Sequence, residues 1–559
     1  MKKYNTLYVV VITILLVALL TWILPITYLQ GELVSGERMQ AGIVNIFSYP
    51  VYTFYNFIYI LVYLLGIGGL YGLLNKTGAY RLLLDKVVKV VKKHQTLWLI
   101  LTVVVLSIIV SLTGYTFELL ILLPFIAAII LLLGYDKMTA ALVTVGSIST
   151  GIIGNTFSKL VVGSFIKILK TVTYENLIVA KLVLLVVCDA ILIFNIIRHA
   201  KNVEKESTVE ESFLVPKKVT SRKIKVWPLV VSLSVFMVIL ILASINWVDA
   251  FKVNFFTTLL DSIKETKVLS KYIILTISLL VVLYNVLISI YRKKKEAKKE
   301  TKTKEEVKTK LMTKRRLIVT ICFGVVAFIA LLKVMLEDVF KATNILTKAL
   351  ELIKVDGLIN GFTFDKLLGN IKAFGEWGYP DYLVWMFVLL LAIKFIYRIK
   401  FDEVIDNIGN GFKNVLYATL VVMLGYTVLM LTASHPVILT IVRPILELTD
   451  GLSVLSYPFV TLFGALFNTD FTYYESHAFT LNYALNYFTT TSTYPLCLLM
   501  TQAMYGLAIL FAPTSAALLF SLSVLDIKYT SWLKKIWMII LEFLLVCFVA
   551  FIVVSQFFI

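Results

Sequence analysis

Fifteen apolar runs follow one another along the 559-residue chain, and they constrain its fold more than any other feature. A helix that crosses a bilayer needs about 20 consecutive apolar residues, and many of the runs approach or exceed that length. Apolar side chains make up 59% of the sequence and charged ones only 16%, with a mean hydropathy of +0.90, whereas a soluble chain carries about 25% charged residues. The sequence therefore predicts an all-α polytopic membrane protein and excludes a soluble protein, a disordered chain, collagen and a coiled coil. The runs are 7–26, 51–75, 96–113, 117–134, 139–172, 177–198, 227–245, 272–291, 317–336, 383–397, 414–433, 454–467, 478–490, 494–526 and 536–557.

The net charge of +19 is concentrated beside the apolar runs. Segment 292–316 alone holds thirteen Lys and Arg against four Glu, and smaller basic clusters lie at 76–94 and 198–225. Basic residues gather in this way in cytoplasmic loops, where they also contact anionic lipid headgroups. The distribution therefore predicts membrane lipid as a partner and no nucleic acid.

The sequence offers no constellation for catalysis. Its four cysteines lie inside apolar runs, with neither metal-ligand spacing nor a disulfide framework. There is no Gly-Lys-Ser/Thr phosphate loop and no nucleophile–base arrangement, so we expect neither an enzyme nor an ATP-driven pump, and no cofactor. The first run, 7–26, is too long for the apolar core of a signal peptide and lacks a small-residue cleavage site, so we expect it to remain as the first span.

Two pairs of apolar runs are predicted to form re-entrant hairpins. Each pair, 96–134 and 454–490, is divided by a polar tip, at 111–116 and 468–477 respectively. Irregular backbone at membrane depth persists only where protein or a wet cavity satisfies it. With each hairpin entering and leaving on one side, about eleven crossings remain, the N-terminus is cytoplasmic and the C-terminus is external.

An interrupted helix is expected after each hairpin. The run 139–172 contains a polar break at 147–156, and the run 494–526 contains one at 511–515. Paired broken helices in inverted repeats are typical of secondary transporters, whose site lies near the membrane midplane between the repeats. We therefore expect 1–50 to form a first span and external loop, 51–198 repeat 1, 199–413 linking scaffold spans with the Lys-rich loop, and 414–559 repeat 2 in the opposite orientation.

Several short motifs lie at or near these segments. They are Trp22-Ile-Leu-Pro25, Gly69-Leu-Tyr-Gly-Leu-Leu-Asn-Lys-Thr-Gly78, Glu118 with Pro124, Gly134-Tyr-Asp136, and Pro513-Thr-Ser515 followed by Tyr529-Thr-Ser-Trp-Leu-Lys534. In this order and spacing they resemble the YfcC/DcuC-like carriers of the ion transporter superfamily, over both repeats but not over the Lys-rich loop or most of 227–380. The resemblance implies a scaffold domain, a transport domain that moves as an elevator, sodium coupling in many members, and a homodimer. The wider group carries dicarboxylates, basic amino acids and other small organic acids.

The chain departs from these relatives at two positions. Its second tip contains Thr472-Tyr-Tyr-Glu-Ser-His477 where relatives often have a small Ser/Gly-rich tip, and its first break contains Asn155-Thr156 rather than Asn-Pro. The tips and breaks hold acids and one nearby cation, Lys159, which favours an amino acid, basic ones included, over a dicarboxylate as cargo. Helix N-termini bind carboxylates without Lys or Arg, so the dicarboxylate alternative stays open.

Short hydroxyl and amide side chains at the tips and breaks form the predicted binding site. Opened helices present free carbonyl and N–H groups, and short oxygen-bearing side chains complete the shell of a hard cation such as Na⁺. The alternative is that the hydroxyls only form hydrogen bonds with backbone groups that lose their helical partners at the break. The predicted substrate-binding residues are Thr113, Gly114, Thr116, Asn155, Thr156, Thr472, Ser476, Thr514 and Ser515, and the predicted residues for a coupling Na⁺ or H⁺ are Glu118, Thr150, Gly154, Asn155, Asp470, Glu475, His477 and Pro513.

Acidic side chains in or near the membrane each carry two interpretations. Glu118, just after the first tip, either couples to protons or a cation or locks the hairpin by a hydrogen bond, because an intramembrane carboxylate must be paired, protonated or wet. The second-tip groups Asp470, Glu475 and His477 form either a titrating gate or a solvated external loop. Asp189 and Glu542 occupy corresponding spans of the two repeats. Asp189 is expected to face protein, and Glu542 to reach towards the interface.

These features predict a secondary active transporter in the plasma membrane of a bacterium. It moves a small charged organic solute, either coupled to Na⁺ or H⁺ or by exchange. The alternative is a non-transporting receptor or assembly protein on the same fold, with 292–316 as its docking element.

Overall fold

The computed structural model describes residues 5–24, 28–29, 32–33, 40–168, 176–203, 211–218, 224–244, 377–448, 456–470 and 494–556. The chain divides into two compact units, of which the first comprises Met1–Ile241 with Gly378–Ile559 and the second Leu242–Trp377. Nearly all of the second unit lies outside the described residues. The predicted spans 272–291 and 317–336 and the Lys-rich loop 292–316 therefore lie outside them as well.

Two glycines mark helix ends in the N-terminal half. Gly78 (φ 64°) separates α3 from α4, and Gly114 (φ 73°) ends α5. Glycine takes up this left-handed conformation without the clash that a Cβ atom would cause. The elements are α1 (Asn5–Ile23), β1 (Tyr28–Leu29), β2 (Glu32–Leu33), α2 (Ile43–Asn56), α3 (Ile58–Thr77), α4 (Ala79–Val91), α5 (Gln95–Thr113), η1 (Glu118–Leu122), α6 (Leu123–Leu132), α7 (Lys137–Ile153), α8 (Val162–Ile168), α9 (Ile178–Asn202) and α10 (Trp227–Ser244).

In the C-terminal half, one helix starts earlier than expected. The segment 398–413, which lies between the apolar runs 383–397 and 414–433, is helical from Phe401 onwards. Asp402 and Glu403 occupy the first turn of that helix, where negative charge favours the helix N-terminus. The elements are α17 (Tyr379–Tyr397), α18 (Phe401–Ser434), α19 (Val437–Leu448), α20 (Ser456–Ala465), α22 (Tyr494–Ala508), α23 (Ala516–Leu525) and α24 (Tyr529–Ser555).

Eight helices within the described ranges are long and apolar enough to cross a membrane, namely α1, α3, α5, α9, α10, α17, α18 and α24. The prediction of a helical polytopic membrane protein is therefore confirmed, and the only addition among the described residues is the two-residue antiparallel pair β1–β2. The predicted span 51–75 is wrong in its limits. Phe57 separates α2 from α3, so that α3 alone has the length and composition of the span.

Glycines let α3 and α18 approach backbone to backbone. A Cβ atom added to Gly411 of α18 would lie 2.1 Å from the Gly68 carbonyl oxygen of α3. One added to Gly72 would lie 2.2 Å from the carbonyl oxygen of Asn407. Small residues four positions apart produce such close contacts between membrane helices, whose association relies on packing rather than on the hydrophobic effect. These two helices consequently form a tightly interlocked pair.

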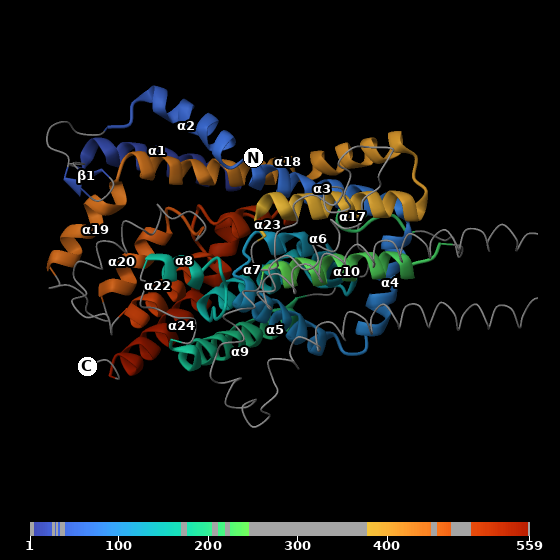
Figure 1. Ribbon diagram of the computed structural model, residues 1–559. Helices are drawn as coiled ribbons and strands as arrows, with labels where there is room; N and C mark the ends of the chain where they lie inside the picture. The colour runs from blue at the N-terminus through green and yellow to red at the C-terminus, as the bar shows by residue number, and fades with distance from the viewer. Residues whose placement is uncertain are drawn as a thin grey trace, which may run out of the picture. The chain divides into compact units, whose positions relative to one another are not determined.

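Helix α7 lies at the centre of the helices that surround the predicted site (Figure 1). It contacts α5, α6, α9, α22 and α23, and every residue from Thr139 to Ile153 is buried. Its sequence is rich in Ala, Gly, Ser and Thr, residues that allow close approach of membrane helices. Because no side of α7 faces outward, its small polar side chains all meet protein.

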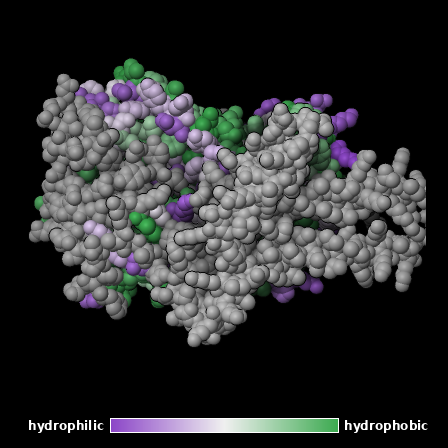
Figure 2. Space-filling model, in the orientation of Figure 1, coloured by the Kyte–Doolittle hydropathy of each residue, from purple (hydrophilic) through white to green (hydrophobic). Residues whose placement is uncertain are grey.

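Apolar side chains also cover much of the described exterior. Residues Ile43, Val44, Phe47 and Tyr55 of α2 are each more than 70% exposed, and hydrophobic side chains gather over α2 at the upper edge of Figure 2. Helices α1, α9 and α24 likewise expose leucine, isoleucine or valine side chains. An apolar exterior of this kind suits a protein whose surrounding solvent is lipid.

Candidate functional site

The first predicted hairpin has its two ends side by side. The Tyr135 hydroxyl donates to Gln95 Oε1 at 3.1 Å, so the end of α6 lies next to the start of α5. Between them the chain turns at Gly114 and continues through η1 and α6. Residues 111–118 therefore form the tip of this pair of helices, at the end far from Gln95.

The first helix break meets this tip directly. Thr156 donates its backbone N–H to the carbonyl oxygen of Ser111 at 2.9 Å, and the Ser111 hydroxyl donates to the Gly154 carbonyl at 2.6 Å. The Asn155 amide donates to the Val110 carbonyl at 3.0 Å, and the Ser158 hydroxyl donates to that of Thr113 at 2.9 Å. Backbone groups that the break frees are thus satisfied by the tip, as irregular backbone at membrane depth requires.

The break lies later in the sequence than predicted. We expected it at 147–156, but α7 remains helical to Ile153 and the irregular segment is 154–161. The Ser147 hydroxyl donates to the Val143 carbonyl at 2.6 Å, one turn back in the same helix, and so does not disrupt it. Gly151 provides room for α5 instead of ending the helix, because an added Cβ would lie 2.4 Å from Val110 Cβ. Of the predicted break, only 154–156 is irregular.

The second break agrees closely with its predicted position of 511–515, since the chain between α22 and α23 runs from Ile509 to Ser515. The Thr514 hydroxyl donates to the Leu466 carbonyl at 2.9 Å, next to the described part of the second tip. The Ser515 hydroxyl caps α23 by accepting from Leu518 N–H at 3.3 Å. Both breaks therefore bind the chain that forms the tip of their own predicted hairpin.

Tyr529 and Trp532, which belong to a motif shared with the resembled family, complete the second break. The Trp532 indole N–H donates to the carbonyl of Leu510 at 2.7 Å, and the Tyr529 hydroxyl donates to that of Phe511. These are two of the carbonyls that lose helical partners where α22 ends. The motif thus has a structural role beside the break.

The two broken helices also bind each other. Gln502 of α22 donates from Nε2 to the carbonyl oxygens of Ile153, at 3.2 Å, and Asn155, at 3.1 Å. In return, the Ser149 hydroxyl of α7 donates to the Gly506 carbonyl at 2.7 Å. A Cβ atom on Gly506 would lie 2.6 Å from Ile153 N, so the crossing needs glycine there.

Side-chain oxygens at this crossing retain unused acceptor capacity. Asn155 Oδ1 and Gln502 Oε1 are buried and have no hydrogen-bond partner in the part of the chain that the structure describes, although the Nδ2 and Nε2 atoms of the same amides are bonded. Glu118 Oε1 is likewise buried without a partner, while Glu118 Oε2 accepts from Thr116 N–H at 3.1 Å. Buried acceptors of this kind can bind a donor from a ligand or contribute oxygen to a hard cation.

Acidic groups from the two tips lie close enough to interact electrostatically. The Asp470 carboxyl group of the second tip lies close enough to Glu118 of the first to act on it electrostatically, and the Tyr426 hydroxyl of α18 donates to Asp470 Oδ2 at 2.6 Å. Asp470 is buried rather than solvated, as are Asn468 and Thr469 before it. This burial opposes the interpretation of Asp470 as part of a solvated external loop.

The structure brings most of the predicted site residues together but leaves part of the second tip undescribed. Thr113 donates its hydroxyl to Ile109 O at 2.7 Å, and Thr150 donates to Ser147 O at 3.2 Å, so both already satisfy backbone. Pro513 lies in the second break between α22 and α23. Among the described residues, no group of three or more His, Cys, Asp and Glu could hold a metal ion. Four predicted residues lie outside the described residues: Thr472, Glu475, Ser476 and His477.

The comparison with known families decides the identity of this scaffold. The family described as C4-dicarboxylate anaerobic carrier, DcuC, matches residues 4–330, more than half of the chain. The protein belongs to the DcuC family. It is therefore a multi-pass membrane carrier of a small organic solute and not an enzyme. No curated protein and no solved structure shows significant similarity to it.

Two residues at the centre of this DcuC-family carrier were missed by the sequence analysis. Gln502 joins both broken helices, and Lys181 of α9 is fully buried, with no hydrogen-bond partner for Nζ among the residues described. The backbone of Lys181 packs against the first break, since a Cβ on Gly154 would lie 2.8 Å from Lys181 O. Gln502 and Lys181 each lie inside an apolar run, where an amide or amine is costly in lipid. That cost could have identified both residues as candidates from the sequence.

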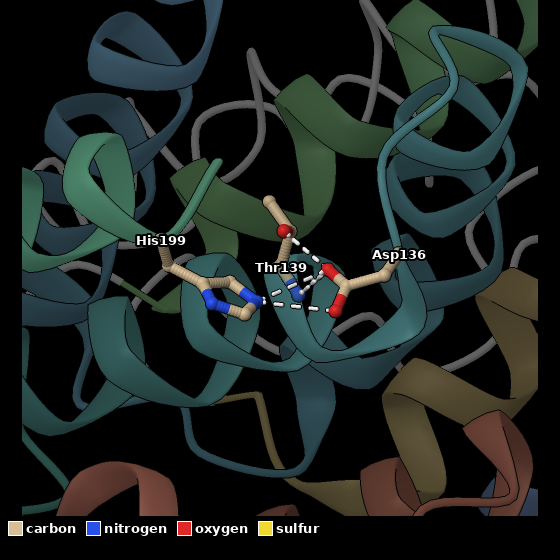
Figure 3. A network of polar contacts seen from close by, with 3 residues as sticks. All are labelled: Asp136, Thr139 and His199. Atoms are coloured by element: carbon tan, nitrogen blue, oxygen red, sulfur yellow. Dashed lines mark hydrogen bonds and ion pairs between the residues drawn. The ribbon is translucent and has the colours of Figure 1, made fainter. Parts of the chain in front are cut away.

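The Gly134-Tyr-Asp136 motif of the carrier forms the turn between α6 and α7 (Figure 3). Asp136 caps α7 by accepting from the Thr139 N–H at 2.9 Å and the Thr139 hydroxyl at 2.6 Å. His199, in the last turn of α9, lies 3.1 Å from Asp136 Oδ2. The network thus ties the start of the broken helix to the end of α9.

Hydrogen bonds stabilise the ionised form of this carboxylate. Partial burial alone would raise the pKa of Asp136, but the hydrogen bonds from His199 and Thr139 lower it below its ordinary value of 3.8. A lowered pKa in the folded state means that the ionised form stabilises the fold. That stabilisation is complete above the unfolded pKa and is lost as the pH falls through the folded one.

We expect Asp136→Ala to lower the free energy of unfolding by about 1 kcal/mol, the usual value of a lost N-cap. Asp136→Asn should cost less, because its amide oxygen can still accept from Thr139. Thermal unfolding of the purified protein in detergent measures both. The matched control is Asp85→Ala, which removes a surface ion pair within α4 and should change little. Equal effects at positions 85 and 136 would contradict the capping role.

Proposed function

We propose that the protein is a secondary active transporter that moves a C4 dicarboxylate by an elevator mechanism. The observation that carries the proposal is the contact of the two broken helices at Asn155 and Gln502, with the first break bonded to the first tip and the second break bonded to the chain next to the second tip. Discontinuous helices offer free backbone dipoles near the midplane, which is how many carriers bind ions and carboxylates. The family description supplies the substrate class. It replaces our expectation of an amino acid, which becomes the alternative outcome of the transport test.

Two correspondences support the inverted repeats that the proposal assumes. Thr156 of the first break binds Ser111 of the first tip, and Thr514 of the second break binds Leu466 near the second tip. The first spans of the two proposed repeats, α3 and α18, are interlocked through glycines, as suits the scaffold of an elevator. In this proposal α5 to α9 and α20 to α24 form the moving domain, and the protein acts as a homodimer.

Hydrogen bonds and ion pairs at the helix ends support the proposed orientation. Asn5 Oδ1 accepts from Tyr529 N–H at 2.9 Å, so α1 and α24 start on the same side. Lys76, at the end of α3, pairs with Glu403, at the start of α18, at 3.4 Å. With the positive-inside rule these ends are cytoplasmic in the bacterial plasma membrane, and the C-terminus is external.

Charge balance gives Lys181 a role in this proposal. A C4 dicarboxylate carries two negative charges, and the fully buried Lys181 lies on the helix that packs against the first break. We assign its ammonium to one substrate carboxylate, with N–H groups of the opened helices for the other. Asn155 Oδ1 and Gln502 Oε1 remain available for substrate or for a coupling Na⁺.

Counterflow of labelled substrate in proteoliposomes tests the proposed function. Vesicles preloaded with succinate, fumarate or malate should accumulate labelled succinate, and vesicles preloaded with arginine or ornithine should not. Runs with and without Na⁺, and with a pH gradient, identify the coupling ion. Exchange of amino acids alone would reassign the substrate, and inactivity of a folded protein with both panels would favour a non-transporting receptor or assembly protein.

Lys181→Gln should raise KM for a C4 dicarboxylate by about tenfold or more, because a hydrogen bond to a charged group contributes roughly 1.5–3 kcal/mol. A monocarboxylate analogue of the same length should lose less. The matched control is Lys76→Gln, which removes an exposed cation at the end of α3. An unchanged KM for Lys181→Gln would exclude this lysine from the substrate site.

A further inference from the structure

A carboxyl group that the proposed substrate site does not use lies in the middle of α9. Asp189 is only 7% exposed, and it reaches both helices that build the first half of the site. Its Oδ2 lies 2.5 Å from the Ser107 hydroxyl of α5, and Thr150 of α7 lies beside the carboxyl group. Ser107 lies one turn before Ser111, and Thr150 one turn before Gly154, the two residues through which tip and break bind each other.

No cation accompanies this carboxyl group within the described residues. The polar and titratable groups that interact with Asp189 from α5, α7 and α9 are Ser107, Thr150 and Cys188, and Cys547 of α24 lies beside Cys188. None of these carries a positive charge. An ionised carboxylate at the centre of a membrane costs at least about 2.5 kcal/mol when nothing compensates it. The surroundings of Asp189 consequently favour its neutral, protonated form.

The hydrogen-bond donors lead to the same conclusion. A serine hydroxyl has one proton to donate, and the Ser107 hydroxyl also lies 3.1 Å from the Val104 carbonyl. When Asp189 is protonated it donates to Ser107, which donates to Val104, and every group in the chain is satisfied. When Asp189 is ionised, the Ser107 hydroxyl donates to the carboxylate and its hydrogen bond to the Val104 carbonyl is lost. Moreover, Asp189 Oδ1 has no hydrogen-bond partner within the described residues, and the Thr150 hydroxyl beside it is directed at Ser147 O.

We propose that Asp189 is a reversible proton-binding site that couples proton movement to the contact between the first tip and the first break. The protonated carboxyl group joins α5 to α7 through α9 while the tip and the break are in contact. Separation of α5 from α7 admits water, which stabilises the carboxylate and releases the proton. This inference rests on the proposed carrier function and names the proton as its coupling ion.

Infrared difference spectroscopy of the full-length protein in lipid vesicles tests the proton site without any substrate. A pH titration should reveal a C=O stretching band of a protonated carboxylic acid that disappears on deprotonation. The band should be absent from Asp189→Asn and present in Glu542→Gln. Glu542 is the matched control because it lies in the corresponding span, α24, and accepts from the amide of Asn195. A band that persists unchanged in Asp189→Asn would overturn the proposal.

Transport gives the second readout. Uptake of succinate by the wild type should accelerate under an inward proton gradient, and Asp189→Asn should lose that response. Ser107→Ala, which keeps the carboxyl group but removes its partner, should shift the titration of the infrared band rather than abolish it. A full response to the gradient in folded Asp189→Asn would also overturn the proposal. The infrared result does not depend on transport, because the Asp189 band can be observed in a protein that carries no dicarboxylate. Failure of the proposed function and failure of the proton site are therefore distinguishable.

Discussion

Replacement of Asn155 by Ala should lower dicarboxylate transport at least about a hundredfold while the protein remains folded. The Asn155 amide donates to the Val110 carbonyl of the first tip, and its Oδ1 is a buried acceptor with no partner among the described residues at the crossing of the two broken helices. Removal of the side chain takes one of two donors from the Val110 carbonyl, which keeps the Gly114 N–H, and deletes an oxygen ligand. Each loss costs roughly 1–3 kcal/mol, and 1.4 kcal/mol corresponds to a factor of ten.

Counterflow with purified protein measures this effect, and size-exclusion chromatography in detergent establishes that the variant is folded. Asn195→Ala is the matched control, since that amide also lies on a membrane helix but binds Glu542 away from the breaks. Thr514→Val examines the second break, because it removes the hydroxyl that binds Leu466 and keeps the side-chain shape. Full transport by both the Asn155 and the Thr514 variants would refute the assignment of the site.

The same crossing indicates how far the sequence alone can locate such a site. Polar residues inside apolar runs are costly in lipid, so the tip at 111–116 and the break near 511–515 could be predicted from their composition. The limits of the first break could not. Ser147 and Thr150 return their hydroxyls to the helix, and Gly151 faces α5, so residues that often interrupt helices here serve packing.

Long-range partners were beyond the sequence analysis for a different reason. Gln502 and Asn155 are 347 positions apart, and nothing in either segment identifies the other as its partner. The distinction between a binding group and a group that satisfies backbone also depends on those partners. Thr113 was predicted to bind substrate, yet its hydroxyl already donates to Ile109 O. By contrast, the presence of many apolar membrane-length helices depends on local composition and was predictable.

The second large effect concerns the contact between α3 and α18. Gly411→Ala should lower the free energy of unfolding by about 1–3 kcal/mol, the usual cost of overpacking. A Cβ at position 411 would lie 2.1 Å from Gly68 O and 3.0 Å from Gly69 Cα. Both opposing atoms belong to the backbone, so no side-chain rotation can relieve the clash. The helices must separate, and the close packing that holds membrane helices together is lost.

Gly409→Ala is an unusually close control, because Gly409 lies two residues away on the same helix and an added Cβ meets nothing within 4 Å. There the alanine should be neutral or stabilising by up to about 1 kcal/mol, the difference in helix propensity between the two residues. Thermal unfolding in detergent compares the pair. Opposite effects would show that backbone contact with α3, and not the flexibility of glycine, is what position 411 requires. If both variants unfolded at the same temperature, α3 and α18 could not be the rigid pair on which the proposed elevator scaffold depends.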